Sequence, residues 1–381
     1  MRILWTSPHC RSDWLDRLGE ESQGGQSVVM NKLPHALTRT NPDITIDIFT
    51  RLQNDDPHAA NPIKLLDDNP RLRLIRLPCG STDCYVPKEI LYGQPIAEFA
   101  ENILSFADRN GLHYDLLHGH YADGWETVNL LKGRLPHRPP TLLTTHSLGR
   151  RKRDDALKRG EGAIDELDRS YNFPVRIASE ERSLSEADGI LPLSTPEAEI
   201  LNNYYDSVPP GDPRVIVIPN GIDQAEFPSP APNAGLKIRN SLAINNSEFL
   251  MVVPSRVDPR KGQENILRAL VEIRPILTIH PFHLLLLAWP ESPTEYSIHL
   301  SQFISDQGLK DCVSIHPPVP HENMPDYFAA ADGVALPSQE YFSIVMLEAM
   351  LLERPLIASI HGGSRDVIKD GVTGLLVDHN D

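Results

Sequence analysis

Two carboxylates near the end of the chain have a spacing that could serve one binding site. Glu340 follows a short apolar segment, 333–337, and Glu348 lies about two helical turns further on. Apolar residues from 344 to 351 repeat with helical spacing, so we expect a buried strand, a tight loop and a helix start here. Unpaired amides at the start of a helix favour an anion. Without such a ligand, the two acids would be an ordinary loop residue and a helix surface residue.

Two cations follow another apolar segment, 249–254, which has the continuous pattern of a strand buried on both faces. Arg256 and Lys261 lie on the turn that joins this segment to a helical pattern at 266–270. A diphosphate needs cations together with oriented amides, and this pair could supply the cations. The alternative is that both side chains are simply solvated.

The first half of the chain has two polar loops that each follow an apolar strand pattern. Open α/β sheets bind their ligands beyond the carboxyl ends of the strands, so we expect these loops to line a site. Imidazole, hydroxyl and carboxylate groups suit a polyhydroxylated substrate, although either histidine loop could be purely structural. The polar residues of the two loops are His118, His120, Tyr121, Asp123, His146 and Ser147.

A glycine pair, Gly24 and Gly25, precedes Gln26 and a helical pattern that begins at Val28. Glycines between a strand and a helix let the backbone come close to a ligand, but a plain flexible loop would have the same composition. The pair is not the G-x-G-x-x-G dinucleotide fingerprint, which disfavours an NAD-dependent oxidoreductase.

Strand and helix patterns alternate through the whole chain, which predicts an α/β protein with two doubly wound domains. The proline-rich segment 227–232 is typical of a linker, so we expect one domain at 1–225 and a second at 226–381. A helix is expected from Pro87 through Phe106, because proline is favourable at a helix start. Strands are expected at 2–6, 44–48, 72–77, 190–195, 215–218, 249–254, 283–289, 313–316 and 333–337, and at the start of 114–124 and of 141–149.

The composition is that of a globular protein of 381 residues, of which 40% are apolar and 23% charged. A formal net charge of −16 argues against nucleic acid or a membrane surface as a partner. Four scattered cysteines lack the spacing of a zinc site and are expected to be free thiols. No stretch has the roughly 20 apolar residues of a membrane span. The first apolar run is also too short for a signal peptide, so we expect a cytoplasmic protein.

Glu340 and Glu348 together resemble the E-x7-E element of retaining, nucleotide-sugar-dependent glycosyltransferases of the GT-B type. The resemblance implies two Rossmann-like domains facing a cleft, and no cofactor or metal beyond the nucleotide-sugar donor. It also implies that Glu340 lies near the transferred sugar, and that Arg256 and Lys261 stabilise the departing diphosphate. The other donor-binding residues that it implies are Gly25, Gln26, Phe342, Ser343, Ile344 and, for the ribose hydroxyls, Glu348. Ser343 stands where the family often has glycine.

The loops at 118–124 and 146–150 narrow the resemblance to sucrose synthases and sucrose-phosphate synthases, and the segments 24–26 and 87–89 favour the latter. Glucose would then pass from UDP-glucose to fructose 6-phosphate. By resemblance, Lys88 and Arg176 hold the acceptor phosphate, and His146 contacts the transferring sugar as a catalytic residue beside Arg256, Lys261 and Glu340. Tyr121, Asp123 and Ser147 are the other acceptor-binding residues that the resemblance implies. Val175 departs from the family, which often has a second basic residue there.

Alternatives remain open at this point. Sucrose synthase, or another hexosyltransferase with a different donor or acceptor, would keep the same donor motifs. A non-catalytic sensor of sugar nucleotides would also keep them. The resembling enzymes continue with further helices after the segment similar to 371–377, so we expect this chain to lack the last helices of its second domain.

Overall fold

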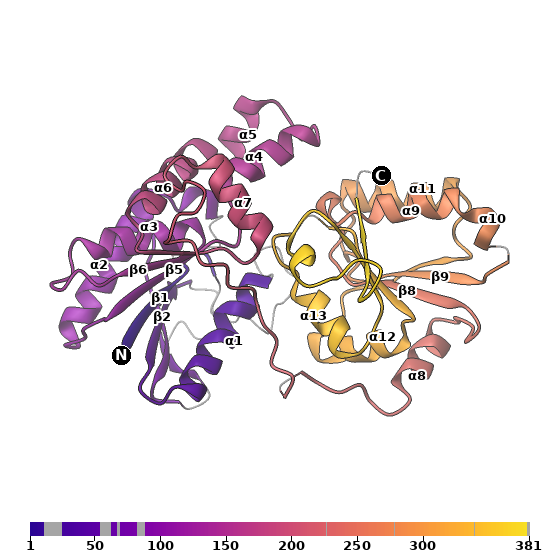
Figure 1. Ribbon diagram of the computed structural model, residues 1–381, viewed down its shortest axis with the longest axis horizontal. Coiled ribbons are helices and arrows are strands. Elements are labelled where there is room, and N and C mark those ends of the chain that lie inside the picture. Colours follow the sequence, from indigo (N-terminus) through magenta and orange to yellow (C-terminus); the bar gives the residue numbers. More distant parts are fainter. Residues whose placement is uncertain are drawn as a thin grey trace. The chain divides into compact units, whose positions relative to one another are not determined.

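The computed structural model describes residues 1–10, 25–53, 62–66, 69–81, 88–225, 227–277, 279–338 and 340–378. The chain forms two compact units, Met1–Ile218 and Pro219–Asp381. This division falls just before the boundary expected between 225 and 226. Each unit is an α/β structure built on one largely parallel sheet, as Figure 1 shows. The predicted pair of doubly wound, Rossmann-like domains is therefore confirmed.

The sheet of the first unit has the strand order β3-β4-β2-β1-β5-β6-β7, and only the edge pair β3–β4 is antiparallel. The central strand β1 pairs with β2 on one side and with β5 on the other, so residues after these strands meet at one edge. The strands are β1 (Arg2–Thr6), β2 (Thr45–Arg51), β3 (Ile63–Leu65), β4 (Leu72–Leu77), β5 (Leu116–His120), β6 (Thr141–Thr144) and β7 (Gly189–Leu191).

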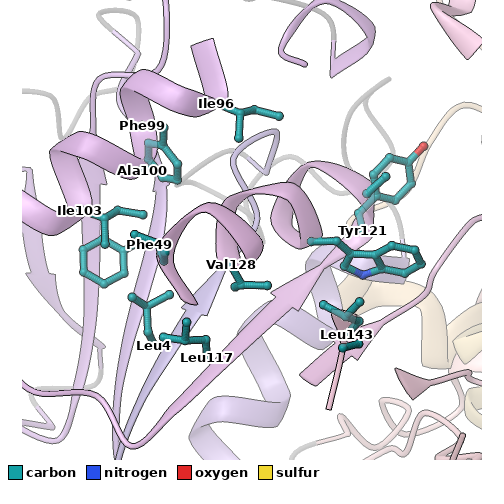
Figure 2. Packing of buried hydrophobic residues seen from close by; sticks show 14 of the residues in the cluster. Leu4, Phe49, Ile96, Phe99, Ala100, Ile103, Leu117, Tyr121, Val128 and Leu143 are labelled. Carbon is teal, nitrogen blue, oxygen red and sulfur yellow. The ribbon is translucent and has the colours of Figure 1, made fainter. Parts of the chain in front are cut away.

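Helices cover both faces of this sheet. On one face, Phe99 and Ile103 of α2 and Val128 of α3 pack against Phe49 and Leu117 of the sheet, as Figure 2 shows. On the other face, Met30 of α1 lies in a second apolar cluster. The helices of this unit are α1 (Gly25–Thr40), the 3₁₀ turn η2 (Lys88–Ile90), α2 (Gln94–Arg109), α3 (Tyr121–Lys132), α4 (Gly149–Lys158), α5 (Ile164–Tyr171), α6 (Phe173–Glu186) and α7 (Thr195–Tyr204).

The second unit has a fully parallel sheet in the order β10-β9-β8-β11-β12-β13. Its strands are β8 (Phe249–Val253), β9 (Phe282–Leu286), β10 (Val313–Ile315), β11 (Gly333–Leu336), β12 (Leu356–Ser359) and β13 (Leu375–Val377). Helices α9 and α11 lie on one face, and α8 and α12 lie on the other (Figure 1). The helical segments are α8 (Ala234–Ser241), η3 (Pro259–Lys261), α9 (Gln263–Glu272), α10 (Arg274–Leu277), α11 (Glu295–Asp306), η4 (His321–Asn323), α12 (Met324–Ala330), α13 (Ile344–Leu351) and η5 (Gly363–Asp366).

Some local predictions were wrong. The helix expected from Pro87 begins at Gln94, because Gly93 has a φ of 88° and interrupts the helical backbone after η2. The strand expected at 215–218 is reduced to a single bridge between Val215 and Ile190. The short edge strand β3 was not anticipated. Among the described residues, no helix combines the length and apolar character that a membrane crossing requires.

Candidate active site

In the second unit, the two predicted cations lie on the turn between β8 and α9. Asp258 caps the 3₁₀ turn η3 by accepting a bond from the Arg260 N–H at 2.9 Å. Gln263, almost fully buried, donates from Nε2 to the carbonyl oxygen of Arg256 at 2.7 Å. These bonds fix the backbone on either side of Lys261, so its side chain starts from a defined position.

The loop after β11 contacts this turn. Because β11 pairs with β8, the carboxyl ends of both strands lie at the same edge of the sheet. A Cβ atom at Gly262 would lie only 2.9 Å from the carbonyl oxygen of Pro337, so the two backbones touch where a larger residue would clash. The Lys261 ammonium then forms an ion pair with the Glu340 carboxylate. Two residues that the sequence assigned to one site are therefore in contact.

This ion pair controls the ionisation of Glu340. Burial alone would raise the pKa of the carboxyl, but the charge of Lys261, supported by Arg260 and Arg256, outweighs it and lowers the pKa below its ordinary value. Glu340 is thus an anion at neutral pH. It can accept hydrogen bonds from sugar hydroxyls, as its predicted place near the transferred sugar requires.

A second glycine pair, Gly362 and Gly363, packs closely against the backbone of the Glu340 loop. A Cβ at Gly362 would lie 2.1 Å from the carbonyl oxygen of Glu340, and a Cβ at Gly363 would lie 2.2 Å from that of Tyr341. Real Cβ atoms do not approach backbone oxygens so closely, so only glycine fits here. The shape of the loop depends on a segment that follows β12.

The start of α13 has the features expected of an anion site. Ser343 is its N-cap residue with extended backbone angles, and no capping hydrogen bond from its side chain is present among the described residues. The flanking residues Phe342 and Ile344 are both buried, at 8% exposure, so they anchor the loop. A contribution of these residues to anion binding would come from their amide groups.

Glu348 lies on the same helix and is almost fully buried. Its Oε1 atom lies 2.7 Å from Nε2 of His321, a residue of the turn η4 that the sequence did not suggest as part of the site. In the predicted contact with the ribose hydroxyls, Glu348 would accept through Oε2, because Oε1 already lies next to His321.

In the first unit, the start of α3 is pressed against the sheet. A Cβ at Gly124 would lie 2.6 Å from the carbonyl oxygen of Thr6, and one at Gly119 would lie 2.6 Å from that of Gly124. Tyr121, the first residue of α3, has a φ of 64°, a left-handed conformation that is costly for a residue with a side chain. Figure 2 shows its hydroxyl pointing away from the apolar cluster.

That hydroxyl meets the predicted phosphate ligand Arg176. Nη1 of Arg176 donates to the Tyr121 oxygen at 2.8 Å, and Nη2 donates to the Ser147 carbonyl oxygen at 3.0 Å. Lys88 lies 5.9 Å from the centroid of the Tyr121 ring. Four residues that the sequence assigned to the acceptor, and that are far apart in the chain, are thus brought together.

Arg176 is a buried cation that is paired with a carboxylate of the protein. It is 3% exposed, and its Nε donates to Glu180 at 2.8 Å. Glu180 also accepts from the Gly149 N–H at 2.9 Å and from the Tyr205 hydroxyl. This network fixes the guanidinium in one orientation but cancels much of its charge. The cluster of Arg150, Arg151, Lys152 and Arg153 also has acidic partners within the same unit.

Three histidines form a neutral column beside Trp5. His118 and His120 each have a ring centroid 4.4 Å from that of Trp5, and Nδ1 of His120 lies 2.9 Å from Nε2 of His146. Burial lowers the pKa of His118 and of His146 to about 3, and burial with the neighbouring histidines lowers that of His120 well below its ordinary value. His146, whose φ is 71°, is therefore a neutral hydrogen-bonding group at physiological pH.

The remaining predicted residues occupy the ends of β1 and α1. Asp123 is fully buried and is bonded to His9, which the sequence did not suggest. Gln26 donates from Nε2 to the Ser7 hydroxyl at 3.0 Å, and Gly25 is the first residue of α1. Gly24 and Pro87 lie outside the described residues. His9 comes just after the carboxyl end of β1, a position that could have drawn attention to it.

Two family models together match most of the chain. The Glycosyltransferase Family 4 model matches residues 23–226, which is more than half of the chain, and the Glycosyl transferases group 1 model matches residues 236–381.

Individual relatives extend over the whole length. A D-inositol 3-phosphate glycosyltransferase of Xylanimonas cellulosilytica is 29% identical over 100% of this chain and 85% of its own. Sucrose-phosphate synthase 4 of Arabidopsis thaliana is 27% identical over 96% of this chain, although the match spans only 41% of that longer protein. The solved structure of a sucrose-phosphate synthase from Thermosynechococcus elongatus matches with a TM-score of 0.79 and 27% identity, covering 100% of this chain and 86% of that one. The chain therefore belongs to Glycosyltransferase Family 4 and is a glycosyltransferase with the GT-B fold.

Proposed function

We propose that the protein transfers glucose from UDP-glucose to fructose 6-phosphate, with retention of the anomeric configuration, to give sucrose 6-phosphate. The observation that supports this most directly is the meeting of Lys88, Tyr121, Ser147 and Arg176 in the first unit. These residues were assigned to a phosphorylated acceptor from their resemblance to sucrose-phosphate synthases. Similarity over the full chain to a solved synthase of that name points the same way.

The charges in this cluster favour an anionic acceptor. Glu180 largely neutralises Arg176, and Glu89 lies 3.6 Å from Lys88 and 3.8 Å from Lys152. A phosphate group could form charge-assisted contacts with Lys88 and Arg176, whereas free fructose could form only neutral hydrogen bonds there. Lys88, 27% exposed, would supply the charge, and Arg176 would supply oriented N–H groups.

The donor would bind the second unit. Arg256 and Lys261 would neutralise the diphosphate together with the first amides of α13, Glu348 would accept from the ribose hydroxyls, and Glu340 would orient the glucose. Because protein cations would carry out the charge neutralisation, we expect turnover without an added metal or cofactor.

The chemical step would be a front-face displacement. The bond between the anomeric carbon and the diphosphate oxygen breaks while a bond to the fructose hydroxyl oxygen forms on the same face. The proton of that hydroxyl passes to the departing phosphate oxygen, so no protein nucleophile is needed. Lys261 and Arg256 would act mainly in the transition state, where negative charge develops on the leaving group.

A second candidate is transfer to an inositol phosphate. It is favoured by the full-length similarity to a protein named D-inositol 3-phosphate glycosyltransferase. This candidate keeps the donor site and the phosphate-binding cluster and changes only the ring that carries the hydroxyls.

The deciding experiment measures product formation from UDP-glucose with fructose 6-phosphate, fructose, inositol 3-phosphate or no acceptor. We expect sucrose 6-phosphate as the main product. Product only from the inositol phosphate would replace our proposal by the second candidate, and equal rates with fructose and its phosphate would exclude a phosphate-selective synthase. If UDP-glucose stabilises the protein against heat but no acceptor yields product, a sugar-nucleotide sensor is the better description.

A further inference from the structure

We infer that His9 recognises the acceptor, accepting a hydrogen bond at Nε2 from a hydroxyl of the sugar, and that Asp123 acts behind it as a positioning residue. This inference rests on the proposed function to the extent that the first unit binds a hydroxylated acceptor. It does not depend on which sugar phosphate that is.

Asp123 itself is poorly placed to touch a substrate. It has no exposed surface, and both of its oxygens already have partners. Oδ2 accepts from the backbone N–H of His9 at 2.8 Å, and Oδ1 accepts from the N–H of Gly124 at 3.0 Å. The close approach of Gly124 to Thr6 locks this arrangement beneath the end of β1. Asp123 can therefore influence a ligand only through the residue that it holds.

The bond to Asp123 fixes the tautomer of the neutral His9 ring. Nδ1 lies 2.9 Å and 3.0 Å from the two carboxylate oxygens of Asp123. A carboxylate only accepts hydrogen bonds, so Nδ1 must carry a hydrogen. In the neutral ring, Nε2 then has a lone pair and can only accept. A sugar hydroxyl can donate to it, whereas a phosphate, carbonyl or carboxylate oxygen cannot.

The position of the ring agrees with this role. The His9 ring lies 4.8 Å from that of Tyr121, and the side chain of His9 remains 10% exposed. The same Tyr121 ring carries the hydroxyl bonded to Arg176 and lies 5.9 Å from Lys88. The Tyr121 ring thus lies next to both the His9 ring and the cations Lys88 and Arg176. A ligand that carries a phosphate and a hydroxyl group could contact both kinds of side chain.

The sharpest test compares His9→Asn with His9→Ala. The asparagine amide can take the place of Nδ1–H toward Asp123, but it has no atom at the position of Nε2. Steady-state kinetics on the full chain should show a rise of about tenfold in the acceptor KM for both variants, the usual effect of one lost hydrogen bond, with kcat and UDP affinity within about twofold. A purely structural role for His9 would be rescued by His9→Asn, and that result would overturn the inference.

Asp123→Asn provides the second arm. It should raise the acceptor KM to a similar extent. An amide at position 123 can donate to Nδ1 as well as accept from it, so the tautomer of the His9 ring is no longer fixed. The His9→Asn/Asp123→Asn double variant should then be no worse than either single variant. Additive effects would mean that the two residues act separately and would contradict the inference. His113→Ala is the matched control, an exposed histidine of the same unit.

Failure of this inference can be distinguished from failure of the proposed function. Wild-type protein is assayed with fructose 6-phosphate and with inositol 3-phosphate. If only the second is used, the proposed function fails and the His9 variants are tested with that acceptor. If fructose 6-phosphate is used and His9→Asn has an unchanged KM, the inference fails and the function stands. If calorimetry detects binding of neither acceptor, both are wrong.

Discussion

Nε2 of His321 lies 2.7 Å from Oε1 of Glu348, so a turn before α12 holds a carboxylate of α13 in place. The Glu348 side chain is only 5% exposed, whereas that of His321 is 39% exposed. Removing the histidine would leave a buried carboxylate without this partner, which is costly.

We therefore expect His321→Ala to weaken UDP binding about fivefold, a loss of about 1 kcal/mol, because Glu348 loses its fixed orientation toward the ribose. Isothermal titration calorimetry with UDP measures this directly. His299→Ala, an exposed histidine paired with Glu264 at 3.2 Å, is the matched control. Tighter binding in the His321 variant would instead mean that the histidine competes with the ribose.

Lys261→Ala should reduce the transfer rate sharply. If the ammonium stabilises charge that develops mainly in the transition state, its loss raises the barrier by about 2 kcal/mol or more, which is roughly a 30-fold loss of kcat. The control is Arg268→Ala, because Arg268 lies on α9 of the same unit, is 60% exposed and pairs with Glu264. An unchanged kcat would remove Lys261 from the mechanism.

Lys88→Ala should affect only the phosphorylated acceptor. The loss of a charge-assisted contact with phosphate should raise the KM for fructose 6-phosphate by about tenfold or more and leave donor binding unaltered. The exposed Lys158→Ala variant, on α4 of the same unit, controls for net charge. Weaker UDP binding in Lys88→Ala would show that this residue serves the donor.

Glu197 should make the folded state less stable as the pH rises. Burial raises the pKa of this carboxyl from 4.5 to about 7, although its Oε2 accepts a bond from the Leu193 N–H. Below about pH 4.5 the group is protonated in both states, and its effect on stability is fully favourable. Between about pH 4.5 and pH 7 the unfolded chain ionises first, and about 3 kcal/mol of stability is lost.

Glu197→Gln should abolish this part of the pH dependence. Urea unfolding at pH 4.5 and pH 8 should show a smaller difference in the free energy of unfolding for the variant than for wild type. Glu199→Gln, an exposed acid on the same helix α7, should not change that difference. If wild type and Glu197→Gln show the same pH dependence, the pKa of Glu197 in the folded state is not raised.

Much of the fold could be predicted from the chain itself. Apolar segments such as those of β1, β4 and β8 are continuous or alternate regularly, so their extent is a local property. The start of α2 could not be located, because it depends on the backbone angle of Gly93 rather than on the favourable Pro87. The short edge strand β3, exposed along its length, has no periodic pattern that a sequence could display.

The order of residues along the chain is enough to predict which residue types follow the strands: the cations at 256 and 261, the acids at 340 and 348, and the histidine loops. Which of these residues are in contact depends on the three-dimensional fold. Asp123 faces His9 because β1 lies beside β5 and Gly124 lets the backbones meet, and Glu340 is held because Gly362 leaves room for its carbonyl oxygen. Such contacts join segments far apart in the chain. They depend on strand order and on close approaches of backbone, neither of which a local pattern encodes.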